Sequence, residues 1–138
     1  MSRRLFFTSA TLLMTFMLAG HAHAGQKKFV PVSFQHEPAP NLAQFSGSIG
    51  DARASADTLQ SIGCAVGGGD WLAGQCYATD AAGDGRMCTF DAKAHPTLVQ
   101  VLSTLTPYSV ITVEYTTDTF NCNRITVDNA SYYLPITP

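Results

Sequence analysis

Three of the four cysteines stand at an even interval of twelve positions, and this spacing constrains the fold more than any other feature of the chain. They are Cys64, Cys76 and Cys88. Two turns rich in glycine and aspartate, at 67–70 and 80–85, separate them. The pattern predicts three short antiparallel strands with one cysteine in each.

Four cysteines allow three disulfide pairings. Turn symmetry leaves either Cys64 or Cys88 as the partner of Cys76. We favour Cys64 with Cys76, because the remaining pair, Cys88 with Cys122, would then tie these strands to the C-terminal part of the chain. A bridge that closes about a dozen residues is worth roughly 3 kcal/mol, and one that closes about 35 residues is worth nearer 4.

The first 24 residues have the features of a secretory signal peptide. Arg3 and Arg4 precede an apolar stretch without charge at 5–20, and Ala22-His23-Ala24 is a cleavage signature. We expect cleavage after Ala24, a periplasmic or secreted mature protein, and no stable membrane anchor afterwards. Because an even number of cysteines in an exported chain is typical of disulfides, we expect two bridges.

Charge excludes one class of partner. Once Arg3 and Arg4 are removed from the eight Lys and Arg residues, six remain against ten Asp and Glu. These six are scattered along the chain, whereas nucleic-acid binding needs a clustered basic face. We therefore expect no nucleic-acid partner.

The mature chain predicts a loosely ordered segment at 25–44, with room for a short edge strand at 29–34, followed by a single domain at 45–138. Its fold class is mainly β with one short helix, either a small antiparallel barrel, possibly OB-fold-like in the order β-β-β-α-β-β, or a simpler sheet. The predicted strands lie at 46–54 and 59–66, which look like a hairpin, and at 71–79, 86–90, 109–115 and 124–128; the predicted helix lies at 91–105.

The turn from Asp80 to Asp91 partly fits a calcium-binding loop, with Asp80, Asp84 and Asp91 as candidate ligands. Ala82 occupies a ligand position that alanine cannot fill, and Asp91 is shorter than the usual bidentate Glu. A glycine-rich hairpin turn explains the same residues. We expect no metal and no cofactor, and keep calcium as the weak alternative.

The tryptophan Trp71 follows the acidic loop tip at Asp70, and Tyr77 lies on the next predicted strand. An aromatic residue at a loop edge offers a large contact area at low entropic cost. These three residues are the candidate binding site, although a tryptophan in such a position more often packs over the core.

No serine elbow, zinc-protease motif, phosphate-binding loop or dinucleotide fingerprint is present in the sequence. The leading hypothesis is therefore an exported non-catalytic module that binds a protein or a glycan. The alternatives are an inhibitor or immunity protein, a structural component of the cell envelope, and a small hydrolase that uses carboxylates of the turn at 80–91.

The cysteine layout also carries a resemblance. The run from Arg53 to Cys64, followed by Cys76-Tyr77-Ala78-Thr79-Asp80 and then Cys88, resembles small exported four-cysteine bacterial proteins of unassigned function. The resemblance covers roughly 53–133. It implies export and disulfides and brings no activity with it.

Overall fold

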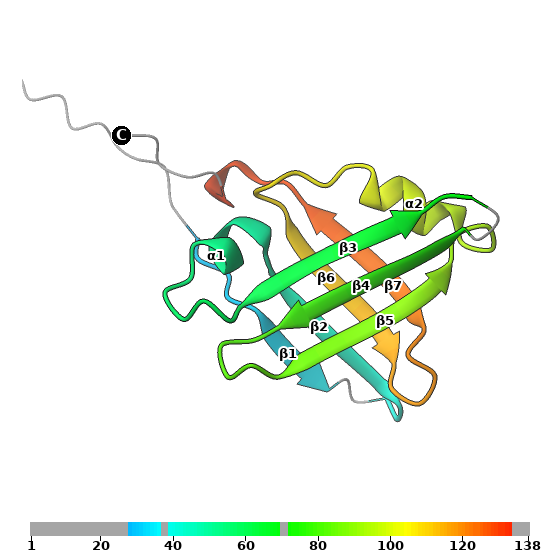
Figure 1. Cartoon of the computed structure of the whole chain (residues 1–138), viewed down its shortest axis with the longest axis horizontal. Helices are drawn as coiled ribbons and strands as arrows, with labels where there is room; N and C mark the ends of the chain where they lie inside the picture. The colour runs from blue at the N-terminus through cyan, green and yellow to red at the C-terminus, as the bar shows by residue number, and fades with distance from the viewer. Residues whose placement is uncertain (1–27, 37–38, 70–71, 134–138) are drawn as a thin grey trace, which may run out of the picture.

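The computed structural model of this protein describes residues 28–36, 39–69 and 72–133. Seven strands form two antiparallel sheets that lie one in front of the other, with their strands crossing (Figure 1). The strands are β1 (Ser33–His36), β2 (Leu42–Ser48), β3 (Ser61–Gly67), β4 (Ala73–Thr79), β5 (Gly85–Asp91), β6 (Val110–Thr116) and β7 (Cys122–Asp128). One sheet has the order β1-β2-β6-β7, and the other has the order β3-β4-β5.

The even cysteine spacing reflects two hairpins whose strands pair in equivalent registers. Cys64 lies opposite Cys76 in β3 and β4, and Cys76 lies opposite Cys88 in β4 and β5. Directly opposite residues of antiparallel strands share a face, so the three cysteines form one row across the sheet. Cys76 and Cys88 are fully buried, which places that row on the face turned toward the other sheet.

The core lies between the two sheets. Phe45, Ile111 and Val113 of the four-stranded sheet have no exposed surface. On the facing sheet, Gly74 is buried opposite Phe90, and a Cβ added to Gly74 would stand 2.0 Å from the Phe90 ring. The Phe90 ring thus occupies the space that a side chain at position 74 would need.

The expected hairpin between 46–54 and 59–66 is wrong. Ser48 ends β2 and caps a short helix, α1 (Ile49–Arg53), by accepting a hydrogen bond from the Asp51 N–H at 3.1 Å. The chain then leaves the four-stranded sheet and begins β3 in the other one. The apolar spacing of 46–54 is compatible with a strand or with a helical turn. The hydrogen bond that the Ser48 side chain accepts stabilises the first turn of the helix and so favours the helix over the strand.

The mainly β, antiparallel fold class is confirmed, but the sheets do not close into a barrel. β2 does not pair with β3, and near β7 the strand β5 has an isolated parallel bridge, from Thr89 to Asn121, the residue just before β7. The β-barrel and OB-fold-like alternative is therefore replaced by two facing sheets. A closed barrel would need ladder pairing at that corner.

The second helix and the N-terminal segment also differ from expectation. Helix α2 (Pro96–Leu102) is shorter than the predicted 91–105, because Pro96 occupies its first turn and Asp91 still belongs to β5. The segment predicted to be loosely ordered contributes β1 and the start of β2, which pair with each other. A short 3₁₀ turn, η1 (Ser131–Tyr133), follows β7.

Two disulfides hold the sheets, Cys64 with Cys76 and Cys88 with Cys122. These are the pairs that the sequence favoured. The first joins neighbouring strands of one sheet, and the second joins β5 to β7 across the two sheets. Two disulfides are typical of an oxidising environment outside the cytoplasm. The predicted signal peptide, 1–24, lies outside the described residues.

Among the described residues, no helix has the length and apolar character that spanning a membrane requires.

Candidate functional site

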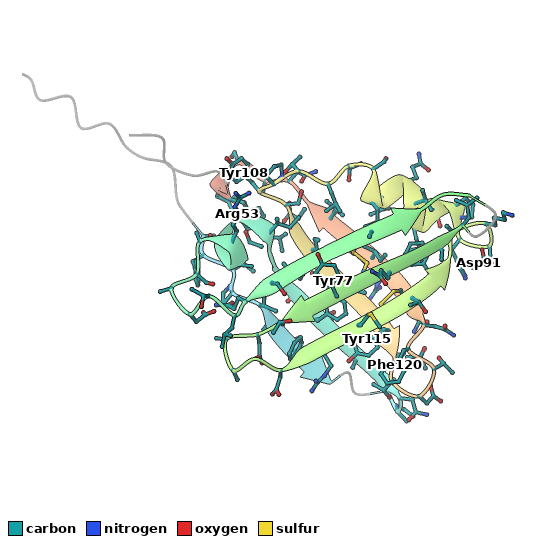
Figure 2. All side chains as sticks on the ribbon, in the orientation of Figure 1. Arg53, Tyr77, Asp91, Tyr108, Tyr115 and Phe120 are labelled. Carbon is teal, nitrogen blue, oxygen red and sulfur yellow. A yellow bond between two sulfur atoms is a disulfide. The ribbon has the colours of Figure 1, made fainter. Side chains whose placement is uncertain are left out.

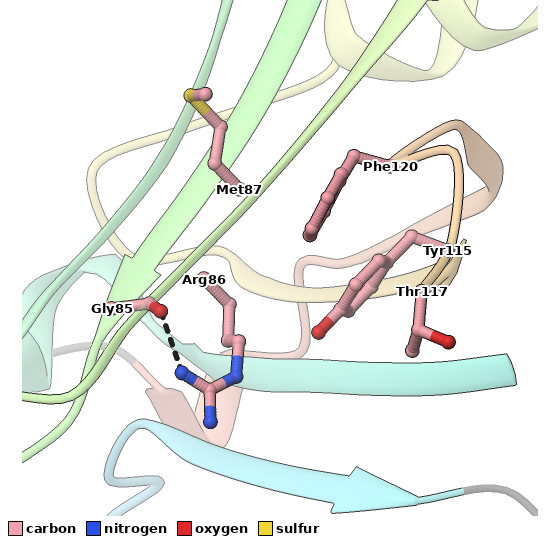
Figure 3. Close-up of a pocket in the computed structure, with 6 residues that line it drawn as sticks. All are labelled: Gly85, Arg86, Met87, Tyr115, Thr117 and Phe120. Atoms are coloured by element: carbon pink, nitrogen blue, oxygen red, sulfur yellow. Dashed lines mark hydrogen bonds between the residues drawn. The ribbon is translucent and has the colours of Figure 1, made fainter. Parts of the chain in front are cut away.

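The candidate site is a pocket at the corner where the start of β5 meets the turn between β6 and β7 (Figure 3). Its volume is about 480 Å³. The strand contributes its first three residues, which are all exposed, and the other wall comes from the end of β6 and the turn that follows. The lining residues are Gly85, Arg86, Met87, Tyr115, Thr117 and Phe120.

Tyr115 forms the floor of the pocket. It is only 3% exposed, and its ring packs on the buried Phe45 with 5.7 Å between ring centroids. Its hydroxyl is a phenol group that can donate a hydrogen bond.

Phe120 stands at the rim with 54% of its surface exposed, and its φ is +54°. A bulky residue in the left-handed region is uncommon and strained. Both of its backbone groups are fixed: its N–H donates to the carbonyl of Thr116 at 2.8 Å, and its carbonyl accepts from Thr89 at 2.8 Å. The protein thus presents this ring to solvent from a backbone that is held on both sides.

Arg86 supplies the only charge among the described lining residues. Its guanidinium lies 5.0 Å from the centroid of the Phe34 ring in β1 and donates to the Gly85 carbonyl at 2.7 Å. In Figure 3 the Tyr115 hydroxyl points toward the side of the pocket where this guanidinium lies. The ion pair within the described residues is Arg124 with Glu114, so no described carboxylate neutralises Arg86.

The second disulfide holds the two walls of the pocket together. Cys88 follows Arg86 by two positions, and Cys122 follows Phe120 by two. A register shift between Glu114 and Tyr115 marks a β-bulge at the same corner. Bulges are frequent beside binding and active sites because they re-aim a side chain. The pocket is therefore built on a cross-linked corner of the fold.

The structure does not bring the sequence-predicted binding residues together with this pocket. Asp70 and Trp71 lie outside the described residues. Tyr77 lies on the outer face of β4, 42% exposed, with its hydroxyl 3.0 Å from the position of a Cβ added to Gly63 (Figure 2). It lies on the opposite face of its sheet from the cysteine row, since residues of alternating position point to opposite faces.

The calcium-loop interpretation is wrong for the described residues, because Asp91 ends β5 whereas Asp80 and Asp84 flank the turn before it. A strand of this length separates them by roughly 20 Å. Asp80 accepts hydrogen bonds from the N–H groups of Ala82 and Asp84, as an aspartate at a turn does. No group of three candidate metal ligands occurs in the described part.

Asp91 organises the approach to α2 instead. Its carboxylate accepts hydrogen bonds from the N–H groups of Ala94 and Lys93, and these bonds lower the pKa of Asp91. The structure thus explains this aspartate as a turn-forming residue. Its carboxylate has no place in the pocket described above.

Two smaller pockets flank α2, with volumes of about 290 and 390 Å³. The first is lined by Cys64, Val66, Val99, Leu102, Ser103 and Leu105, and the second by Gln100, Val101, Thr104, Ile125, Thr126 and Val127. Neither holds a carboxylate or a histidine among the described lining residues. They give the predicted carboxylate-dependent hydrolase no support.

Sequence reasoning missed the pocket. Its walls stand about thirty positions apart in the chain and are mostly apolar, so no chemical motif marks them. Comparison with protein-family models, with curated proteins and with solved structures finds no match for this chain. The geometry of the pocket is therefore the basis for a functional argument.

Proposed function

We propose that this chain is an exported, non-catalytic binding protein that holds part of a partner protein in the pocket between Arg86, Tyr115 and Phe120. The observation that carries the proposal is the exposed Phe120 ring in a left-handed backbone conformation above an apolar pocket. A residue in a sparsely populated backbone conformation costs about 1–3 kcal/mol of stability, and such residues cluster at binding and active sites. An exposed aromatic residue fixed beside a pocket is the kind of anchor that dominates protein interfaces.

The chemistry of the lining favours a protein over a glycan. The described walls are largely apolar, and their polar side-chain groups come from Arg86, Tyr115 and Thr117. A sugar ring carries several hydroxyls that each need a partner, whereas an aliphatic or aromatic side chain needs apolar contact. An inhibitor or immunity protein is the specific version of this function.

Rigidity also supports binding. The Cys88–Cys122 bridge and the hydrogen bond from Thr89 to Phe120 fix the spacing of the two walls. A site that is already ordered loses less conformational entropy when a partner binds, so more of the contact energy appears as affinity. No acid–base pair or nucleophile–base pair lies among the described residues that line the pocket.

A glycan ligand is the second candidate, on the outer face of β4. Tyr77 exposes its ring there beside the small residue Gly63. A flat aromatic ring of this kind can stack on a sugar. The predicted loop site at Asp70 and Trp71 belongs to this alternative, because that loop joins β3 to β4.

Export completes the proposal. The predicted signal peptide with cleavage after Ala24 would deliver the chain to the periplasm or outside the cell, where the two disulfides form. The cysteine layout of small exported four-cysteine bacterial proteins fits the same destination. We propose no nucleic-acid partner and no cofactor.

A comparison of aromatic variants tests the site. The mature protein, immobilised, is incubated with envelope extract and, separately, with an array of bacterial glycans. We expect Phe120→Ala to reduce the captured protein at least about tenfold, the scale of a single interface anchor. Tyr77→Ala, which changes an exposed aromatic residue that does not line the pocket, is the matched control and should leave capture unchanged.

The opposite pattern contradicts the proposal. If Tyr77→Ala or Trp71→Ala abolishes binding while Phe120→Ala does not, the site lies on the outer face or its loop. Glycan binding that depends on Tyr77 would establish the second candidate in its place.

A further inference from the structure

We propose that the pocket receives an extended segment of the partner protein, which pairs as an added strand with the free edge of β5 and places an acidic side chain on Arg86. This inference rests on the proposed function and deepens it, because it names the conformation and the chemistry of the ligand. The occupant is a short protein segment, because the exposed stretch 85–87 is followed by the buried Cys88 and by Thr89, whose N–H already donates to the Phe120 carbonyl.

The direction of the backbone groups in β5 follows from the first disulfide. Cys64 and Cys76 stand directly opposite each other with 4.0 Å between Cα atoms, which is the spacing of a non-hydrogen-bonded pair. The N–H and C=O of Cys76 must then point to β5, so Cys88 forms the hydrogen-bonded pair there. In β5 the alternate residues, Met87 among them, direct their backbone groups away from β4.

The outer edge of β5 already forms one backbone hydrogen bond within the molecule. Thr89 has the same orientation as Met87, and its N–H donates to the carbonyl of Phe120 at 2.8 Å. Met87, two positions earlier, makes no backbone hydrogen bond beyond the sheet within the described residues. An open strand edge beside a pocket is the geometry used for peptide recognition by strand addition.

The alternation of a strand predicts which ligand side chains enter the pocket. Residues two positions apart lie on one face, roughly 7 Å from each other. If one of them reaches the guanidinium of Arg86, the next on that face lies toward the ring of Phe120. We therefore expect an acidic residue and an apolar residue separated by a single position.

Charge complementarity selects the acidic residue. Arg86 is held by the Phe34 ring and the Gly85 carbonyl, and no described carboxylate pairs with it. A guanidinium keeps donors available for a carboxylate in such a position, and the Tyr115 hydroxyl offers a further donor in the same pocket. Such a bond is charge-assisted and is therefore stronger than one between neutral groups.

The probe is a phage-displayed library of random linear peptides, selected on the immobilised mature protein. We expect the selected peptides to share an acidic and an apolar residue separated by one position. One of them, synthesised, should slow hydrogen exchange at the Met87 amide of the unmodified protein. Its counterpart with the acidic residue replaced by the corresponding amide should bind about tenfold more weakly.

Two proline variants separate edge pairing from pocket filling. Met87→Pro removes the N–H that the ligand would use and no bond within the sheet, and proline is tolerated on edge strands. Val66→Pro is the matched control, because Val66 lies on the β3 edge with its backbone directed outward in the same way. We expect at least about a tenfold loss of peptide binding for Met87→Pro and none for Val66→Pro.

Each failure has its own signature. If peptides lose binding with Phe120→Ala but keep it with Met87→Pro, and the Met87 amide exchanges as before, strand addition is wrong and the proposed pocket function stands. If the library yields no peptide, or peptides that no pocket variant weakens, both proposals fail. Selected peptides without an acidic residue, or equal affinity for Arg86→Gln, overturn the role of Arg86.

Discussion

At the scale of single residues, Phe120 combines a strained backbone with an exposed ring, and these two properties can be separated by substitution. Asparagine tolerates the left-handed region far better than phenylalanine. We expect Phe120→Asn to raise the free energy of unfolding by about 1 kcal/mol, the lower end of the cost of that conformation for an ordinary residue. The same variant should lose partner binding.

Urea denaturation measures the stability, and capture of the partner measures the function. Thr119→Asn, one position earlier and outside the left-handed region, is the matched control and should change neither property. A Phe120→Asn variant that is less stable than the unmodified protein would contradict this prediction. It would show that the Phe120 ring stabilises the fold by packing, and that no stability is given up for binding at this position.

Asp57 gives the chain a pH dependence. Its carboxylate accepts hydrogen bonds from the side-chain amide and backbone N–H of Gln60 and from the N–H of Leu59, and these bonds lower the pKa of Asp57 to about 2. Gln60 in turn accepts from the N–H of Val32 at 2.8 Å. The carboxylate thus orders the loop before β3 and, through Gln60, the chain before β1.

The lowered pKa of Asp57 determines whether stability rises or falls with pH. Because the pKa is lower in the folded state than the ordinary value near 3.9, the stabilisation is present above about pH 4 and is lost as the pH falls toward 2. We expect Asp57→Asn to be less stable than the unmodified protein at pH 6, with the difference shrinking toward zero near pH 2. Chemical denaturation across this range measures it, and a constant difference would contradict the assignment.

At the scale of elements, the two disulfides have different tasks. Cys64–Cys76 closes 12 positions inside one sheet, whereas Cys88–Cys122 closes 34 and joins the two sheets at the pocket. The chain-entropy relation gives the longer bridge about 1 kcal/mol more stabilisation. We expect Cys88→Ala with Cys122→Ala to destabilise the protein by about 1 kcal/mol more than Cys64→Ala with Cys76→Ala.

The two double variants serve as controls for each other. Removing the longer bridge should also weaken partner binding, because the walls carrying Arg86 and Phe120 lose their cross-link. Removing the shorter bridge should leave binding unchanged in the folded protein. Equal loss of binding in both would mean that the disulfides act through global stability alone.

The same elements show what the sequence can predict. The cysteine row and its turns could be predicted from the twelve-residue spacing of the cysteines, because the register of a hairpin is set by the length of its turn. Helix α1 was missed although Ser48 and Asp51 stand at capping positions, since a five-residue helix carries too little periodicity to outweigh an apolar run. The pocket depends on how β5 meets the β6–β7 turn, which no local pattern encodes.

At the scale of the whole molecule, the two sheets share one small core and few direct links. Backbone pairing between β5 and β7 is a single bridge at Thr89, so much of what holds that corner is the Cys88–Cys122 bond. A chain without its first 24 residues would have 114 of the 138. Domains of that size bury a limited fraction of their surface.

Because the core is small and the disulfides supply much of the stability, we expect folding to depend on the redox state of the cysteines. The two bridges together are worth roughly 6–7 kcal/mol by chain entropy, which is comparable with the total stability of a typical domain, about 5–15 kcal/mol. We expect the mature protein to melt cooperatively when oxidised and to lose most of its near-ultraviolet circular dichroism at 37 °C in excess reductant. The variant without Cys64 and Cys76 should melt between these two states, because it keeps one bridge. A reduced protein that melts within a few degrees of the oxidised one would show that the core suffices alone, and export would then need a reason other than disulfide formation.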